Sequence, residues 1–254
     1  MAGSHNMCTV SWIHDGNRYE LLFNRDEKLT RKRAMPPRLA TRDGVRFLAP
    51  VDGDFGGTWI ASNEFGASIC LLNGANLTGS SDGHPRKARS RGLLLLDLIS
   101  SSSLAAVCER VREAELAAFA PLTLAVLETG KPTALVEWNG SQKTFVSQSE
   151  PCFMLTSSSF DTEEVRTRRQ EEFNRLMVSA ASCDATLLST FHRSHSPARS
   201  AYSVCMHRPD AETVSFSRVR VSPAETTFLY APAAPCESVP EMQLTLTRRR
   251  PHLE

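Results

Sequence analysis

Short apolar segments separated by turn residues dominate the first third of the chain. The segments 8–13 (CTVSWI) and 18–24 (RYELLFN) flank an Asp-Gly turn, and the segments 58–62 (TWIAS) and 67–73 (ASICLLN) flank Asn-Glu-Phe-Gly. Two short apolar segments joined by a glycine-containing turn are typical of a β-hairpin. We therefore predict two hairpins, joined by a polar, Pro- and Arg-rich surface loop over residues 28–46.

The spacing of apolar residues becomes helical in the middle of the chain. Apolar residues crowd together from about residue 87 to residue 100, and residues 101–119 repeat them at helical intervals behind a serine cap. A second helical block is predicted from Asp161 to about Ala181, and a shorter helix from about Asp184. Further strands are predicted at the segments PLTLAVLE, TALVEW, CFMLTS, YSVCMH, TVSFSRV and TTFLYAP.

The predicted order is strands, two helices, strands, two helices and strands. Hairpin-linked strands imply antiparallel sheets, and two helical blocks suggest a helix layer on either side of the sheets. No repeat or linker divides the chain, so we predict an α+β fold with one domain over residues 7–231 and a C-terminal tail over residues 232–254. Residues 1–6 (MAGSHN) resemble an expression leader, which makes Met7 the natural start.

Charge, apolar runs and cysteine spacing argue against several classes of protein and partner. A formal net charge of +1 gives no reason to expect a nucleic acid or an anionic membrane surface. No apolar run approaches the roughly 20 residues of a membrane-spanning helix. The seven cysteines are scattered without a Cys-x-x-Cys pair, which supports neither a disulfide framework nor a zinc ribbon. We therefore expect a cytoplasmic protein without a membrane span.

The histidines give no clear metal signal. His192 and His195 have a spacing that a metal ion could use, but no acidic residue or cysteine lies beside them in the sequence. We interpret both as polar loop histidines, and we predict neither a metal site nor a cofactor.

The position of one cysteine suggests chemistry. Cys8 follows Met7 directly, and it becomes the first residue if Met7 is removed. A free α-amino group titrates near pH 8 and can take the proton of its own thiol, so an N-terminal cysteine combines nucleophile and base. Such a site also needs a carboxylate, a cation and donors for an oxyanion. The polar run 24–27 (NRDE) ends the second predicted strand and can fold back beside Cys8.

Three motifs together resemble a known family. The start Met-Cys, the NRDE run and the segment 56–66 (GGTWIASNEFG) are similar to the NRDE family, called transport and Golgi organisation protein 2 in animals. More distantly, the chain resembles cysteine N-terminal nucleophile hydrolases such as bile salt hydrolases and penicillin V acylases. These enzymes begin with Met-Cys and carry an Arg-Asn-x-Asp cluster and an Asn-Glu-x-Gly hairpin followed by Leu-Asn. The resemblance implies a four-layer αββα sandwich of antiparallel sheets.

The resemblance also implies roles for the N-terminal residues. Cys8 would be the nucleophile, Arg25 would support its thiolate and Asp26 would hold its amine. Because NRDE and Arg-Asn-x-Asp are offset by one residue, Asn24 and Glu27 remain alternatives.

Residues farther along the chain complete the implied site. The side chain of Asn73 and the N–H of Gly74 would lie near the oxyanion, and Arg199 falls where the hydrolases have a second arginine. Ser157 stands where the hydrolases have an oxyanion-hole asparagine, and its shorter side chain puts hydrolysis in doubt. Trp59 either lines the substrate pocket or fills the sheet core.

Two functions are consistent with these residues. The first is hydrolysis of an amide or thioester of a small acyl substrate through an acyl-Cys8 intermediate. The second is binding or trafficking of haem or acyl-CoA without catalysis, in keeping with the links of the animal family to secretory organisation, lipid metabolism and haem movement. The oligomeric state is not predicted.

Overall fold

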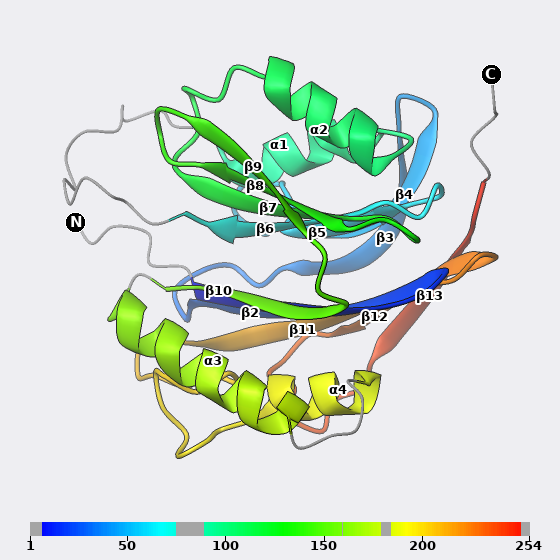
Figure 1. Ribbon diagram of the computed structural model, residues 1–254. Coiled ribbons are helices and arrows are strands. Elements are labelled where there is room, and N and C mark those ends of the chain that lie inside the picture. The colour runs from blue at the N-terminus through cyan, green and yellow to red at the C-terminus, as the bar shows by residue number, and fades with distance from the viewer. Residues whose placement is uncertain (1–6, 75–88, 159, 179–183, 250–254) are drawn as a thin grey trace.

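The computed structural model describes residues 7–74, 89–158, 160–178 and 184–249 and arranges them in four layers (Figure 1). Two antiparallel sheets stack face to face in the middle. Helices α1 (Arg91–Leu98) and α2 (Leu104–Glu113) cover one outer face, and helices α3 (Thr162–Val178) and α4 (Ala185–Arg193) cover the other. The predicted α+β class and αββα layering are confirmed. The predicted leader, residues 1–6, lies outside the described residues.

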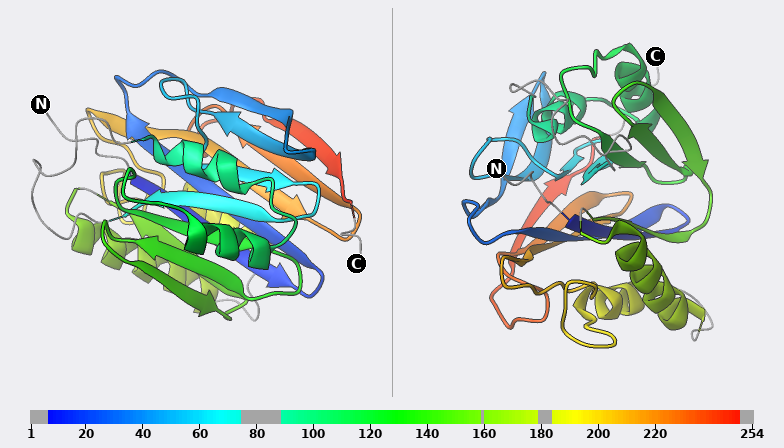
Figure 2. Two further views of the ribbon diagram at one scale, coloured as in Figure 1. Left: turned by 90° about the horizontal axis from the view of Figure 1, so that it is seen from above. Right: turned by 90° about the vertical axis from the view of Figure 1, so that its left-hand side faces the viewer.

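Each sheet contains one of the predicted hairpins (Figure 2). The six-stranded sheet has the order β10-β1-β2-β11-β12-β13, and the seven-stranded sheet runs from β3 to β9 in chain order. The strands of the first sheet are β1 Met7–Asp15, β2 Arg18–Lys28, β10 Cys152–Ser157, β11 Ala211–Val221, β12 Glu225–Ala231 and β13 Met242–Thr247. Those of the second are β3 Met35–Arg42, β4 Val45–Val51, β5 Ile60–Asn63, β6 Ser68–Asn73, β7 Leu122–Leu127, β8 Thr133–Trp138 and β9 Lys143–Gln148.

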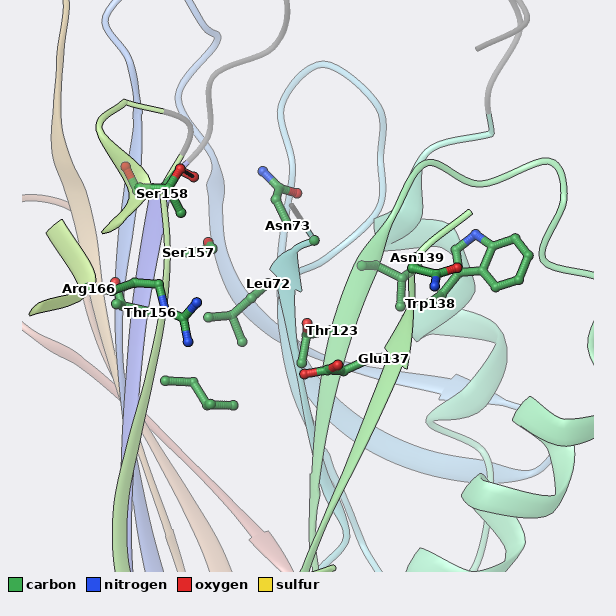
Figure 3. A pocket seen from close by; sticks show the side chains of 14 residues that line it. Leu72, Asn73, Thr123, Glu137, Trp138, Asn139, Thr156, Ser157, Ser158 and Arg166 are labelled. Carbon is green, nitrogen blue, oxygen red and sulfur yellow. Dashed lines mark hydrogen bonds between the residues drawn. The ribbon is translucent and has the colours of Figure 1, made fainter. Parts of the chain in front are cut away.

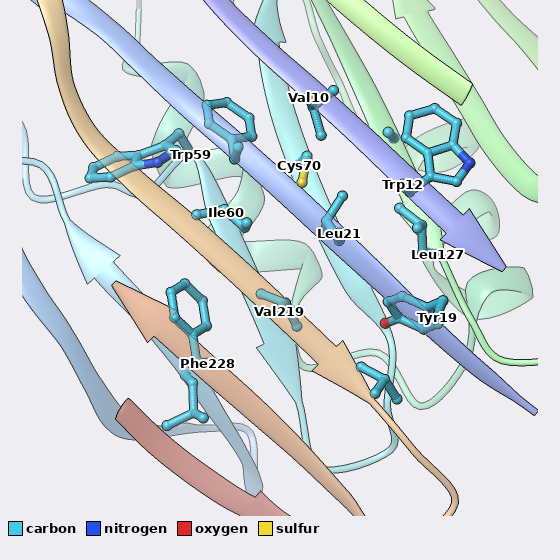
Figure 4. Close-up of a cluster of buried hydrophobic side chains, with 14 of the residues drawn as sticks. Val10, Trp12, Tyr19, Leu21, Trp59, Ile60, Cys70, Leu127, Val219 and Phe228 are labelled. Atoms are coloured by element: carbon cyan, nitrogen blue, oxygen red, sulfur yellow. The ribbon is translucent and has the colours of Figure 1, made fainter. Parts of the chain in front are cut away.

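Three hydrophobic clusters fill the spaces between the four layers. The cluster between the sheets includes Val10, Trp12, Leu21 and Ile60, all fully buried (Figure 4). A second cluster joins α1 and α2 to the seven-stranded sheet, and a third joins α3 and α4 to the six-stranded sheet. Because side chains alternate along a strand, Cys8 shares the inner face of β1 with Val10 and Trp12. The fold therefore directs Cys8 into the space between the sheets.

Three predictions about local structure are wrong. The expected loop over residues 28–46 contains β3 and the start of β4, and β3 is polar because it is an edge strand with mostly exposed side chains. The segment YSVCMH forms no strand, and its Ser203 hydroxyl instead bonds the carbonyls of Ser200 and Cys205. The expected tail over residues 232–254 contains β13, which pairs with β12 and buries Leu246.

Two further expectations concern disulfide bonds and membrane spans. Cys152 is disulfide-bonded, which the scattered cysteine spacing did not predict. Cys8, Cys70, Cys108, Cys205 and Cys236 are free. Among the described residues, none of the helices is both long enough and apolar enough to cross a membrane.

Candidate functional site

The register of three neighbouring strands aligns Cys8 with two polar residues. On β1, Cys8 lies opposite Ser157 of β10 on one side and opposite Arg25 of β2 on the other. Directly paired residues of an antiparallel sheet point to the same face, with Cβ atoms about 4.5–5.5 Å apart. Ser157, Cys8 and Arg25 therefore form a row across the inner face of the six-stranded sheet.

The NRDE run divides between the two faces of β2. Since side chains alternate along a strand, Arg25 and Glu27 point between the sheets, while Asn24 and Asp26 point to the helix side. The contacts of each residue agree with this division: Arg25 bonds Glu27 and Asp52, whereas the Asn24 amide bonds the carbonyl oxygen of His192 on α4. Only half of the motif therefore presents its side chains to the space that Cys8 faces.

On the helix side, Asp26 forms a buried ion pair. Its carboxylate lies 3.3 Å from both terminal nitrogens of Arg169 on α3 and accepts a hydrogen bond of 2.6 Å from Thr213 on β11. Arg169 is fully buried and also donates to the hydroxyls of Thr9 and Thr156. Burial raises the pKa of Asp26 to about 6, although Arg169 opposes that rise. This arrangement ties α3 to the sheet directly behind Cys8.

Asn24 and His192 form a second buried link. The Asn24 amide donates to the carbonyls of His192 and Val204, and its oxygen lies 2.9 Å from Nδ1 of His192. Nε2 of His192 lies 2.8 Å from the Ser11 hydroxyl. Burial lowers the pKa of His192 to about 3, so the ring is neutral at physiological pH. The interpretation of His192 as a polar loop residue is wrong, because it is a fully buried residue of α4.

A cavity of about 280 Å³ opens in front of Cys8 and Arg25. One terminal nitrogen of Arg25 bonds Asp52 at 2.5 Å, and the guanidinium lies 4.2 Å from the ring centroid of Trp59. Arg31 bridges the same Asp52 at 2.8 Å and Glu27 at 3.5 Å. Arg25 is thus held on a tryptophan face by carboxylates, at the wall of the cavity that Cys8 also lines.

Trp59 both lines this cavity and packs in the core between the sheets. Its indole Nε1 is buried and has no hydrogen-bond partner among the described residues. The preceding Gly57 lies against the first turn of α1, where an added Cβ would be 2.6 Å from the carbonyl carbon of Gly92. Gly57 therefore permits a close backbone contact with α1, and both Trp59 and Arg91 line the cavity.

Asn73 connects this cavity with a second one of about 250 Å³ (Figure 3). Ser157 and Arg166 lie on one wall of the second cavity, and Asn73, Thr123 and Glu137 lie on the other. The Ser157 hydroxyl is buried and makes no hydrogen bond within the described part of the chain. It is therefore an available donor in the strand position next to Cys8.

Comparison with known proteins gives the family. The family model for Transport and Golgi organisation 2 matches residues 7–220. The chain belongs to this family. No curated protein is a significant match to the sequence. The family match includes Cys8, the NRDE run and every residue of the two cavities described above.

Solved structures similar to this Transport and Golgi organisation 2 family member are N-terminal nucleophile hydrolases. An N-acylethanolamine-hydrolyzing acid amidase ortholog from Caenorhabditis elegans is 11% identical, with a TM-score of 0.60 and coverage of 91% of this chain and 94% of that chain. A C2A mutant of conjugated bile acid hydrolase from Clostridium perfringens is 12% identical (TM-score 0.57; 95% and 97% covered). Penicillin V acylase from Agrobacterium tumefaciens is 11% identical (TM-score 0.53; 94% and 86% covered). At these identities the similarity shows the fold.

The environment of Cys8 in this family member favours a neutral thiol. Burial raises the pKa of Cys8 to about 12, and the Asp26 carboxylate raises it further, while Arg25 opposes the rise. In the chain as it stands, Met7 precedes Cys8, and the nitrogen of Cys8 is an amide. The thiol then has no amine of its own to accept its proton.

Two other residues implied by the resemblance are placed differently from expectation. The N–H of Gly74 donates to the carbonyl of Pro121 at 3.0 Å, so it is already used within the sheet. Arg199 is exposed and lies outside the residues that line the two cavities, where its guanidinium is 3.0 Å from Nδ1 of His207. Eight of the predicted residues line the two cavities: Cys8, Arg25, Asp26, Glu27, Trp59, Asn73, Gly74 and Ser157. Asn24 and Arg199 line neither.

Sequence reasoning missed several residues of the site. Asp52 and Arg31 hold Arg25 and Glu27. Arg31 lies in the expected loop over residues 28–46, and Asp52 follows it in a stretch for which no element was predicted. Arg169 occupies a buried helix position between Val165 and Phe173, each four residues away. A cation at a position where helical spacing predicts a core residue was the available signal.

Proposed function

We propose that this protein is an N-terminal-cysteine hydrolase that cleaves an amide or thioester of a small acyl substrate through an acyl-Cys8 intermediate. The observation that carries the proposal is the row Ser157–Cys8–Arg25 across one sheet. Cys8 and Arg25 line one cavity, Ser157 lines the second, and Asn73 lines both. The fold shared with amidases and acylases supports it.

In the proposed reaction, the Cys8 sulfur attacks the carbonyl carbon of the substrate. The thiol proton passes to the α-amine of Cys8 and from there to the leaving nitrogen or sulfur, so the C–N or C–S bond breaks as the thioester forms. Water then attacks the thioester carbonyl and loses a proton to the same amine. The bond between the carbonyl carbon and the Cys8 sulfur breaks, the sulfur takes the proton back from the amine, and a carboxylic acid is released. Removal of the residues before Cys8 is a condition of the reaction, because it creates the amine.

Ser157 and Asn73 are the proposed donors to the oxyanion. The Ser157 hydroxyl is buried without a partner beside Cys8, and Asn73 lines both cavities on the opposite sheet. Arg25 supplies positive charge next to the sulfur and lowers the pKa of Cys8. The buried indole N–H of Trp59 can bond an acceptor of the substrate.

The second candidate function is binding of haem or acyl-CoA without catalysis. The high pKa of Cys8 behind Met7 and the occupied N–H of Gly74 favour it, since both weaken catalysis. Cationic side chains beside the aromatic rings of Phe55 and Trp59 suit an anionic ligand with an apolar part. In this function the cavity takes up ligand whether or not Cys8 is terminal.

The test compares protein that begins at Cys8 with protein that retains Met7, and includes Cys8→Ala as a control. Each protein is incubated with a panel of N-acyl amides and acyl thioesters, and peptide mass spectrometry follows acylation. We expect an acyl adduct on the Cys8 peptide, and turnover, only in the protein that begins at Cys8. Equal turnover by Cys8→Ala would overturn the hydrolase proposal.

A binding assay separates the two functions. Haem and a long-chain acyl-CoA are titrated into the protein that retains Met7, followed by the Soret band and by Trp fluorescence. Stoichiometric binding that survives Cys8→Ala, with no acylation in any protein, would establish the second function instead of the first.

A further inference from the structure

Four potential metal ligands meet on the helix side of the six-stranded sheet, away from the residues of the two cavities. They are His195 after α4, Cys205 and His207 before β11, and Cys236 after β12. The ligand atoms of all four lie within 4.8 Å of one another. The chain brings them together from three segments. The Cys205 N–H donates to the Ser194 carbonyl, which places the segment before β11 beside His195, and β12, which leads to Cys236, pairs with β11.

The spacing of these atoms is close to that of a tetrahedral zinc site. The sulfurs of Cys205 and Cys236 each lie 3.5 Å from Nε2 of His207. Zinc bonds of about 2.3 Å to sulfur and about 2.0–2.1 Å to nitrogen, at a tetrahedral angle, give a sulfur–nitrogen edge of about 3.6 Å. Two edges of the tetrahedron are therefore already present.

His195 provides an independent indication of a ligand. Its Nε2 atom is buried and has no hydrogen-bond partner among the residues that the structure describes. A buried ring nitrogen without a partner is costly, and a metal ion at the centre of the cluster would satisfy it. The ring of His195 lies beside that of His207, with centroids 5.2 Å apart.

We propose that His195, Cys205, His207 and Cys236 bind one zinc ion in a closed, structural site. Two thiols lose their protons to solvent on binding, so two thiolates and two neutral imidazoles surround the dication with no net charge. Two cysteines and two histidines are a common ligand set of structural zinc sites. This assignment replaces the expectation of no metal site, which depended on neighbours in the sequence alone.

The site would fasten the C-terminal segment to the rest of the domain. Cys236 lies in a turn closed by the bond from the Glu237 N–H to the Ala234 carbonyl, and β13 follows it. Cys236 also lies beyond residue 220, where the family match ends. The fourth ligand is therefore a property of this chain that the family match does not supply.

Arg199 opposes metal binding by His207. Its guanidinium, 3.0 Å from Nδ1 of His207, requires that nitrogen to be an acceptor, which leaves the proton on Nε2. A zinc ion on Nε2 requires the proton on Nδ1 instead. Binding therefore displaces Arg199, whose exposed side chain can turn into solvent.

The test uses the full chain, freed of metal and kept from oxidation so that Cys205 and Cys236 remain free thiols. Zinc is titrated in competition with a chromophoric chelator, and Co²⁺ is titrated separately to detect the visible absorption of tetrahedral thiolate coordination. We expect one zinc ion per chain, and an affinity about a hundredfold or more weaker in Cys236→Ser, since each of four ligands carries a similar share of the binding free energy. Cys236 is exposed, so this variant keeps its fold, which circular dichroism checks.

Two further variants make the result specific. Cys108→Ala removes a thiol of α2 outside the cluster and should bind zinc as tightly as the parent. Arg199→Gln removes the competing donor and should bind zinc more tightly than the parent. The proposal is overturned if the parent binds no zinc at micromolar concentration, or if Cys236→Ser binds as the parent does. Weaker or unchanged binding by Arg199→Gln would overturn the assignment of Nε2 of His207 as a ligand.

Discussion

Replacing His192 by Asn should remove a large part of the acid sensitivity of the folded protein. His192 is fully buried, with Nδ1 at the Asn24 carbonyl oxygen and Nε2 at the Ser11 hydroxyl. Protonation would put an unpaired positive charge in the core and close to Arg169, whose charge also disfavours it. Folding therefore requires the neutral ring. The unfolded chain, in contrast, protonates it freely in acid.

The size of the effect follows from the two pKa values of His192. Burial lowers the pKa from 6.5 to about 3 in the folded protein. For a group whose folded pKa is lowered, the stabilisation is complete above the unfolded value and is lost as the pH falls below it. Each pH unit below 6.5 costs about 1.4 kcal/mol, so lowering the pH from 7 to 5 removes about 2 kcal/mol.

The assay is urea denaturation of the parent protein and His192→Asn at pH 7 and at pH 5. The Asn variant starts less stable, but its free energy of unfolding should fall by about 2 kcal/mol less than that of the parent over this interval. Asp26 titrates in the same interval with the opposite sign, since its pKa is raised to about 6, and it is present in both proteins. Equal losses in the two proteins would refute the reasoning.

Three further substitutions test other parts of the structure. Arg169→Met leaves the Asp26 carboxylate without its buried counter-charge and should lower the free energy of unfolding by about 3–5 kcal/mol at neutral pH. Because protonation of Asp26 relieves this, urea denaturation should show a smaller loss at pH 5 than at pH 8, and equal losses would argue against the pair. Gly57→Ala brings a Cβ against the Gly92 backbone and should cost about 1–3 kcal/mol, measured as a lower Tm; an unchanged Tm would mean that the two segments separate freely. In protein that begins at Cys8, Ser157→Asn should raise amide turnover about a hundredfold or more, whereas unchanged turnover would place residue 157 away from the oxyanion.

The sequence was sufficient for the layers of the fold because buried strands and amphipathic helices have clear periodicity. The edge strands were harder to predict. β3 and β9 were missed because most side chains of β3 are exposed and no side chain of β9 is buried, so neither shows clear apolar alternation. The segment 202–207 was wrongly predicted as a strand because it is apolar. Val204, Cys205 and Met206 are buried, and Val204 packs with residues of α4, but the segment forms no strand.

The candidate site was predictable only where short motifs mark it. Cys8, Arg25 and Trp59 were found through motifs, and the structure brings them to one cavity. Helical spacing could mark Arg169 as a buried cation, but local spacing does not show that its partner is Asp26, which lies on a distant strand. The cluster around His207 was missed for the same reason, since its ligands span residues 195 to 236 and meet only when β11 and β12 pair.

The alternation of side chains along β2 has a consequence for how genetic variants of the NRDE run combine. Asn24 and Asp26 act on the helix side, whereas Arg25 and Glu27 act between the sheets. Arg25 and Glu27 bond each other and share the network of Asp52 and Arg31, so substitutions of these two should be strongly non-additive. Substitutions on opposite faces have different partners and should combine nearly independently. Substitutions of Arg25 or Glu27 would thus alter ligand handling, whereas substitutions of Asn24 or Asp26 would reduce protein abundance.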